Sequence, residues 1–152
     1  MSVPDLAKAR EFYIDLLGAI EEVEPLSWRE NPFIDEIVGL TGSAADQFMC
    51  RLGGTYIEVF EYLSPRSELQ DPDRGVNSFG YTHFALQVED LRACYERLVA
   101  AGIRVHREPA WDAIKVAEDG IKSGYAGTYC RDFFDNVFEI LEIHPNPELP
   151  SL

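Results

Sequence analysis

The feature of this sequence that most constrains its fold is an internal repeat. Asp5 begins a run of apolar residues at helical spacing that ends at Gly18, and Asp90 begins a second such run that ends at Gly102. Aspartate is a favoured helix N-cap, and glycine is favoured just after the last turn. Each run therefore predicts one amphipathic helix.

Strand patterns repeat at nearly the same offset. Tyr56–Glu61 and Val137–Glu142 each place a glutamate after two apolar residues and a second glutamate three positions later. Gly53-Gly54 and Asp135-Asn136 lie where neighbouring strands must reverse in a tight hairpin. The predicted strands that follow the helices are Ala19 to Val23, Phe48 to Leu52 and Thr55 to Leu63 in the first half, and Ile103 to Arg107, Tyr125 to Arg131 and Asn136 to Ile143 in the second.

These elements predict an α+β fold of two tandem βαβββ modules. With 46% hydrophobic residues, the chain has enough apolar material for one core, so we expect a single domain over residues 1–152. The expected parts are module 1 (1–63), a linker rich in Pro, Ser, Asp and Gly (64–80), module 2 (81–145) and a tail (146–152).

Two longer stretches occupy equivalent places in the halves. Leu26 to Gln47 contains Trp28 and Phe33, and Ala110 to Ser123 contains Trp111. We expect these stretches to cover a cleft as mobile lids.

Composition excludes several classes of partner and location. The chain has 13 basic and 27 acidic residues and a formal charge of −14, which disfavours binding to nucleic acid or an anionic membrane. Its three cysteines form no CxxC pair, and no signal peptide or long apolar span appears. We therefore expect a cytoplasmic protein.

Three residues break the expected pattern of their strands. Tyr81 to Val88 alternates, and His83 points away from its more apolar face. Glu139 shares a strand face with apolar neighbours, and Glu58 is placed in the same way in the first half. A carboxylate buried there needs a partner.

A bound cation would explain the histidine and both glutamates together. Its charge offsets the desolvation of carboxylates, and mixed nitrogen and oxygen ligands suit Fe, Mn, Co, Ni or Zn. The alternative is that each residue is ordinary, since strand glutamates are usually exposed and a lone histidine is usually structural.

The chain resembles the vicinal oxygen chelate superfamily, the group of glyoxalases, bleomycin-resistance proteins and extradiol dioxygenases, over nearly its whole length. The residues that carry this resemblance are Val3-Pro4-Asp5-Leu6 with Phe12-Tyr13, Tyr56-Ile57-Glu58, Thr82-His83-Phe84 ahead of Val88-Glu89-Asp90-Leu91, and Asp132 to Glu139. Phe133 and Asp135 depart from the turn that is common in the family.

The resemblance implies a metal held in a cleft between two βαβββ modules. His83 and Glu139 then correspond to the ligands of the second module, and Glu58 to the last-strand ligand of the first. The family's first ligand is a histidine about five residues before the position of Val3, where this numbering has no residue. We interpret the first strand as truncated, with Met1 to Val3 as its remainder.

The implied chemistry is that of a glyoxalase-like lyase, isomerase or epimerase acting on a small carbonyl compound through a metal-stabilised enolate. Glu139 or Glu58 is then the catalytic base. One alternative is an extradiol-type dioxygenase acting on an aromatic substrate, although that pattern does not use a glutamate at Glu58. The other is a metal-free binding protein in which Trp28, Trp111 and the tyrosines stack on the ligand.

Other residues are left outside the predicted site. His106 and His144 have no counterpart in the repeat, and we expect ordinary solvent-facing roles for both. Cys50, Cys94 and Cys130 are expected to be unremarkable thiols, with Cys94 on the core side of its helix. By resemblance, and because symmetric dimers are common, we also expect a homodimer.

Overall fold

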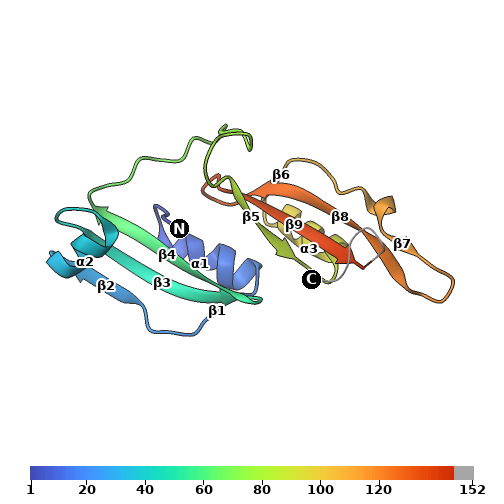
Figure 1. The fold of residues 1–152 in the computed structure, drawn as a ribbon, viewed down its shortest axis with the longest axis horizontal. Helices are drawn as coiled ribbons and strands as arrows, with labels where there is room; N and C mark the ends of the chain where they lie inside the picture. The colour runs from blue at the N-terminus through green and yellow to red at the C-terminus, as the bar shows by residue number, and fades with distance from the viewer. Residues whose placement is uncertain (146–152) are drawn as a thin grey trace. The chain divides into compact units, whose positions relative to one another are not determined.

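The structure is a computed structural model and describes residues 1–145 (Figure 1). The chain divides into two compact units, Met1–Asp71 and Pro72–Leu152, and each is described by itself. Each unit packs a helix on one face of a sheet, so the predicted α+β class is confirmed. The expectation of a single domain stays a prediction, and the expected tail 146–152 lies outside the described residues.

The second unit follows the predicted order of strand, helix and three strands. β5 is parallel to β9, whereas β8 is antiparallel to both β9 and β6, which gives the strand order β5-β9-β8-β6. A short β7 pairs with the beginning of β8. The elements are β5 (His83–Gln87), α3 (Leu91–Ala100), β6 (Arg104–Val105), the 3₁₀ helix η2 (Trp111–Ala113), β7 (Lys115–Val116), β8 (Lys122–Arg131) and β9 (Val137–His144).

The first unit has the same plan with additions. β3 lies at the centre of its sheet, pairing with β1 and β2 along one edge and with β4 along the other. Met1 to Val3 takes the place of the first strand, with Ser2 forming a single parallel bridge to Phe60 of β4. The elements are α1 (Leu6–Arg10), the π-helix η1 (Glu11–Leu16), β1 (Ile20–Glu21), β2 (Leu26–Arg29), α2 (Pro32–Val38), β3 (Ala44–Leu52) and β4 (Thr55–Ser64).

The first helix differs from its prediction. Asp5 caps it as expected, accepting a hydrogen bond from the backbone N–H of Lys8 at 3.0 Å, but the helix widens into a π-helix after Arg10. Phe12 and Tyr13 are both fully buried there, with their rings 4.9 Å apart. No feature of the sequence predicts this widening.

The first stretch expected as a mobile lid consists largely of regular secondary structure. The stretch Leu26 to Gln47 contains β2, α2 and the beginning of β3, and Trp28 within it is only 6% exposed. Its indole N–H donates to the buried Ser43 hydroxyl at 2.8 Å, which anchors the segment to its own sheet. Phe33 on α2 is exposed, as a lid residue would be.

The second expected lid is anchored on the helix side of its unit. The Trp111 ring lies against Tyr95 of α3 at 5.4 Å, and the Arg92 guanidinium lies 4.2 Å from its centroid.

At Gly124 of β8, φ is +99°, and an added Cβ would lie 2.3 Å from the carbonyl oxygen of Ala113, so this close approach requires glycine.

Alternation along the last strands decides which side chains meet a helix. In β9, Phe138 and Ile140 are fully buried in the core that also contains Leu98 of α3. Val137, Glu139 and Leu141 therefore lie on the other surface, which we call the open face of the sheet. The open face of the first unit is defined in the same way, opposite α1.

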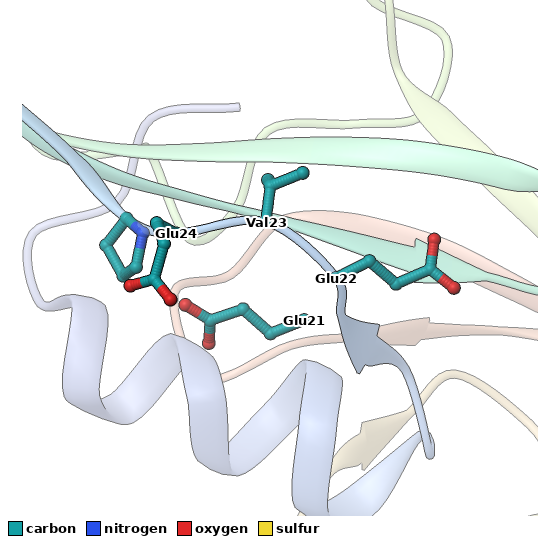
Figure 2. A pocket seen from close by; sticks show the side chains of 5 residues that line it. Glu21, Glu22, Val23 and Glu24 are labelled. Carbon is teal, nitrogen blue, oxygen red and sulfur yellow. The ribbon is translucent and has the colours of Figure 1, made fainter.

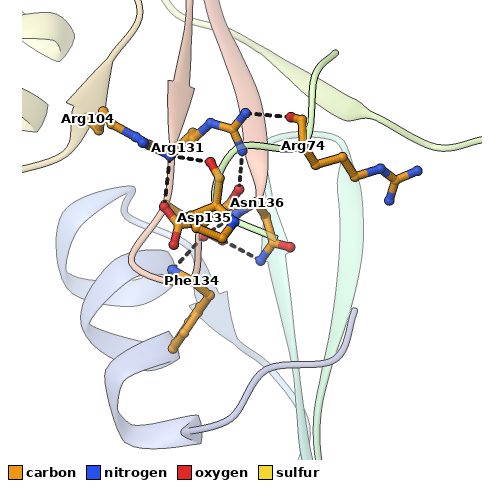
Figure 3. Close-up of polar contacts among 8 residues, drawn as sticks. Arg74, Arg104, Arg131, Phe134, Asp135 and Asn136 are labelled. Carbon is orange, nitrogen blue, oxygen red and sulfur yellow. Dashed lines mark hydrogen bonds and ion pairs between the residues drawn. The ribbon is translucent and has the colours of Figure 1, made fainter. Parts of the chain in front are cut away.

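The turn between β8 and β9 is held by a dense polar network (Figure 3). Asp132 Oδ1 accepts hydrogen bonds from the backbone N–H groups of Phe134 and Asn136 at 2.8 and 2.9 Å. Arg131, only 6% exposed, donates to the carbonyl oxygens of Asp135 and Arg74. Asp135 adopts φ +66°, so the expectation of a tight reversal at this position is confirmed.

Within residues 1–145, no helix has both the length and the apolar character needed to cross a membrane.

Candidate functional site

The open face of the second unit brings two of the three predicted site residues together. His83 begins β5, and the parallel register pairs it with Val137 and pairs Ala85 with Glu139, so His83 and Glu139 are diagonal neighbours on one face. Nε2 of His83 lies 3.9 Å from Oε2 of Glu139. Their side chains are 29% and 28% exposed, so both are accessible from the open face.

Thr82 orients the imidazole of His83. Its Oγ1 lies 3.0 Å from Nδ1 of His83, within hydrogen-bond distance. When Nδ1 carries the ring proton and donates it to this hydroxyl, Nε2 keeps its lone pair. Such a partner on the second nitrogen is the usual means by which proteins orient a metal-binding histidine.

Two residues that were not predicted as site residues complete this surface. Tyr129 of β8 pairs directly with Glu139, and its ring meets the His83 ring edge-on at 4.7 Å. On its other side, Tyr129 meets the ring of His106 at 6.2 Å. Burial and the nearby charges of Arg131 and Arg104 lower the pKa of His106. The alternating pattern of β8 was the signal for Tyr129, because it places every second residue on the open face.

Glu58 belongs to the other unit and is more exposed than predicted. It lies on the open face of β4, paired with Met49 of β3, and its side chain is exposed. The argument that its carboxylate is buried among apolar neighbours is therefore wrong for Glu58 and partly right for the half-buried Glu139. The reason is that an open face leaves alternate side chains accessible even where their neighbours are aromatic.

The distance between His83 and Glu139 fits two ligands of one ion. Nitrogen and oxygen ligands bind divalent ions such as zinc at about 2.0–2.2 Å, so two of them lie at most about 4.4 Å apart. The 3.9 Å separation falls within that limit. Within the described residues, no three His, Cys, Asp or Glu side chains converge as a complete ligand set. The assignment of His83, Glu139 and Glu58 as metal ligands stays a prediction.

The second glutamate of each repeat has a structural role on the helix side. Glu142, 5% exposed, accepts hydrogen bonds from the Leu91 backbone N–H and from Lys122 Nζ, both at 2.8 Å. Nε2 of His144 lies 2.6 Å from the same carboxylate. Although burial opposes it, this bonding lowers the pKa of Glu142 to about 2. The expectation of a solvent-facing role for His144 is therefore wrong, because it is half-buried beside Glu142.

The first unit repeats this contact in a simpler form. Glu61 Oε2 accepts a hydrogen bond from the backbone N–H of Leu6 at 3.1 Å, at the N-terminus of α1. A carboxylate at this point satisfies an otherwise unpaired N–H and interacts well with the helix dipole. The recurrence of a glutamate three positions after Glu58 and Glu139 was the sequence signal for this pair of contacts.

A hollow of about 350 Å³ lies at the edge of the first unit, away from the predicted residues (Figure 2). Its acidic lining is largely engaged within the protein. Glu21 accepts two hydrogen bonds from the Arg10 guanidinium, at 2.8 and 2.9 Å, and Glu22 accepts one from Arg51 at 2.7 Å. The residues that line the hollow are Glu21, Glu22, Val23, Glu24 and Pro25.

The three cysteines are buried free thiols, as expected. Cys94 lies on the core side of α3, and burial raises its pKa. Burial also raises the pKa of Cys130 to about 12. Neither thiol is therefore activated as a nucleophile.

Comparison with known proteins agrees with this arrangement. The profile of the Glyoxalase/Bleomycin resistance protein/Dioxygenase superfamily matches residues 1–140. A 2-epi-5-epi-valiolone epimerase from Actinomyces sp. is 32% identical over 111 residues, which cover 71% of this chain and 60% of the relative. The chain therefore spans less than two thirds of that relative's length.

Solved structures of related fold cover nearly the whole chain. A glyoxalase family protein from Bacillus cereus superimposes with a TM-score of 0.77 at 20% identity, covering 95% of this chain and 91% of that one. The fosfomycin resistance protein FosX from Listeria monocytogenes, complexed with Mn(II) and sulfate, gives a TM-score of 0.55 at 19% identity, covering 98% and 90%. With its two units of helix on sheet and a matching profile over nearly its full length, the chain belongs to the glyoxalase/bleomycin resistance protein/dioxygenase superfamily.

Proposed function

We propose that this chain is a metal-dependent, glyoxalase-like enzyme that removes a proton next to the carbonyl group of a small substrate, as lyases, isomerases and epimerases do. The observation that carries the proposal is the His83–Glu139 pair on the open face, with Thr82 placed to orient the imidazole. The epimerase relative supports the isomerase side of this class.

His83 and Glu139 are the proposed ligands from the second unit, and Glu58 is the proposed contribution of the first. The donor set of imidazole and carboxylate suits Fe, Mn, Co, Ni or Zn, and FosX of similar fold was crystallised with Mn(II). When bound, such an ion supplies an electrophile that polarises a substrate carbonyl.

The side chains of this protein then supply orientation and proton transfer. Tyr129 and Thr82 contact the His83 ring from two sides and restrict its rotation. Glu139 and Glu58 are both accessible carboxylates, so either one serves as the base that takes a proton from the carbon next to the carbonyl. A small substrate of low charge suits a chain whose net charge is −14.

Metal analysis tests the ligand assignment. We would purify the untagged protein and measure bound metal by plasma mass spectrometry in the wild type, His83→Ala and Glu139→Ala, with His106→Ala as the matched control on the same face. We expect near-stoichiometric metal in the wild type and in the control, and loss in the other two variants. Wild-type protein that holds no metal even after reconstitution would contradict the proposal.

Solvent isotope exchange tests the reaction class. A panel of small ketones incubated with the metal-loaded protein in D₂O is expected to include a compound whose hydrogen next to the carbonyl exchanges, as followed by proton NMR. Glu58→Gln and Glu139→Gln, compared with each other, then identify the base. Oxygen consumption with catechols and no exchange would instead favour the dioxygenase alternative.

The oligomeric state is tested separately. Sedimentation velocity on the same preparation measures whether the expected homodimer forms.

A further inference from the structure

Gln47 is a buried polar residue that the proposed chemistry does not use. It lies on the open face of β3, is only 9% exposed, and its Oε1 atom has no hydrogen-bond partner within residues 1–145. A buried oxygen without a donor destabilises a fold, and most such atoms in native proteins are satisfied. Within the described residues, Gln47 therefore offers an unused acceptor to a hydrogen-bond donor of a bound molecule.

The surroundings of Gln47 are apolar and aromatic. The sheet register pairs Gln47 with Leu26 of β2 on one side and Phe60 of β4 on the other. The rings of Phe60 and Tyr62 stack 5.8 Å apart, and Trp28 lies edge-on to both at 6.0 Å. Neither Leu26 nor Phe60, the two residues paired with Gln47 in the register, carries a side-chain donor, whereas the three rings supply an aromatic surface.

Glu58 lies on the same face, two positions before Phe60 along β4. Diagonal neighbours in antiparallel strands are about 7–8 Å apart, which a small molecule spans. A ligand held at Gln47 therefore lies beside the carboxylate that the proposed function uses.

We propose that Gln47, Phe60 and Tyr62 form a binding subsite for a hydroxylated, uncharged small molecule, in which the Gln47 amide oxygen accepts a hydrogen bond from a ligand hydroxyl. The donor is uncharged because a cation would lose its hydration beside Leu26 and Phe60. The proposal rests on the proposed function in one respect, namely that the bound molecule is the substrate. In that case the carbonyl substrate of the proposed reaction also carries a hydroxyl group.

Access to Gln47 requires a small side-chain movement. Leu26 is 49% exposed and lies on the four-residue strand β2, so we expect its side chain to change rotamer within nanoseconds. Because the register places Leu26 next to Gln47, we expect rotation of this side chain to open access to the amide without any change in the backbone. We therefore expect Leu26→Ala to accelerate binding.

The test compares two ketones on metal-free protein. Binding of 2-hydroxycyclohexanone and of cyclohexanone is followed by the fluorescence of Trp28 in a Trp111→Phe background. We expect the hydroxyketone to bind about tenfold more tightly, the effect of one added hydrogen bond. Gln47→Met keeps the side-chain length but removes the acceptor, so we expect both ketones to bind this variant with the affinity of cyclohexanone. The control Gln70→Met, in the linker, is expected to retain the preference for the hydroxyketone.

A second measurement needs no ligand. Because the unpaired amide oxygen destabilises the empty protein, we expect Gln47→Met to raise Tm by about 2–4 °C in differential scanning calorimetry. Three results of the binding test would each overturn the subsite. They are equal affinities of the wild type for the two ketones, a preference for the hydroxyketone that persists in Gln47→Met, and no binding of either ketone at 50 mM. Since these titrations use metal-free protein, their outcome is separate from that of the metal analysis.

Discussion

The two units share one plan but stabilise it by different means. Both place a glutamate from their last strand against the first backbone N–H of their helix, Glu61 at Leu6 and Glu142 at Leu91. In the first unit Glu61 accepts this hydrogen bond from Leu6, while in the second Lys122 and His144 also bind the carboxylate of Glu142. The repeat therefore determines where the carboxylate lies, and residues outside the repeat determine how strongly it is held.

The segments expected as lids show a similar contrast. Trp28 is buried within the sheet of the first unit and bonded to Ser43, whereas Trp111 lies on the outer side of α3 against Tyr95 and Arg92. Equivalent positions in a repeat thus carry the same residue type in different environments. Of the two indoles expected to stack on a ligand, Trp111 lies against Tyr95 of α3, whereas Trp28 lies beside Phe60 and Tyr62 of β4.

The largest effect is expected from replacing these two tryptophans in turn. Trp28→Ala removes a buried aromatic side chain and leaves Ser43 without its donor, so we expect a loss of about 3–5 kcal/mol in the free energy of unfolding. Trp111→Ala removes ring contacts with Tyr95 and Arg92 and an exposed hydrogen bond to Glu108, and we expect a loss of about 1 kcal/mol. Urea unfolding followed by circular dichroism measures both. Equal losses would contradict the contrast between the two segments.

The paired glutamates provide the next comparison. Glu142→Ala leaves Lys122, His144 and a helix N–H without their shared acceptor, and we expect a loss of about 3 kcal/mol. Glu61→Ala removes a single hydrogen bond, for which we expect about 1 kcal/mol. The same unfolding measurement applies, and a larger loss for Glu61→Ala would show that the extra partners of Glu142 contribute nothing to stability.

The pH dependence of stability separates the same two positions. The pKa of Glu142 is lowered to about 2 from an ordinary value of 4.5, so its contribution is fully present above pH 4.5 and is lost as the pH falls towards 2. We expect this contribution to be about 2–3 kcal/mol, because the half-exposed Lys122 is screened by solvent. Tm measured from pH 6 to pH 3 should fall less steeply in Glu142→Gln than in the wild type, and parallel curves would refute the assignment.

The smallest effects concern the helix caps, where the units are alike. Asp5 and Asp90 accept backbone hydrogen bonds at 3.0 and 2.9 Å from the residue three positions ahead. We expect Asp5→Ala and Asp90→Ala each to lower stability by about 1 kcal/mol. A clear inequality, measured by chemical unfolding, would show that the π-helix after α1 changes how strongly the first helix depends on its cap.

Much of the fold was predictable from local patterns. The Asp caps, the hairpins at Gly53-Gly54 and Asp135-Asn136 and the long strands follow from side-chain spacing and turn chemistry, which act over a few residues. The strand bounds were less accurate: β3 begins at Ala44, four residues before its prediction, and β1 covers only Ile20–Glu21. Pairing with a neighbouring strand decides such bounds, and pairing depends on residues far away in the sequence.

For the candidate site, the sequence by itself determined which face of its own strand His83 or Glu139 occupies and that a second glutamate recurs three positions after Glu58 and Glu139, because β-strand alternation is a local property. That His83 and Glu139 share one face depends on the parallel pairing of β5 with β9. The tertiary structure alone decided that Tyr129 meets the His83 ring, that Gln47 is buried without a donor among residues 1–145, and that Glu142 rather than Glu58 is a deeply buried glutamate. Burial and contact distance depend on which strands and helices pack together, and that packing brings together residues with no proximity in the chain.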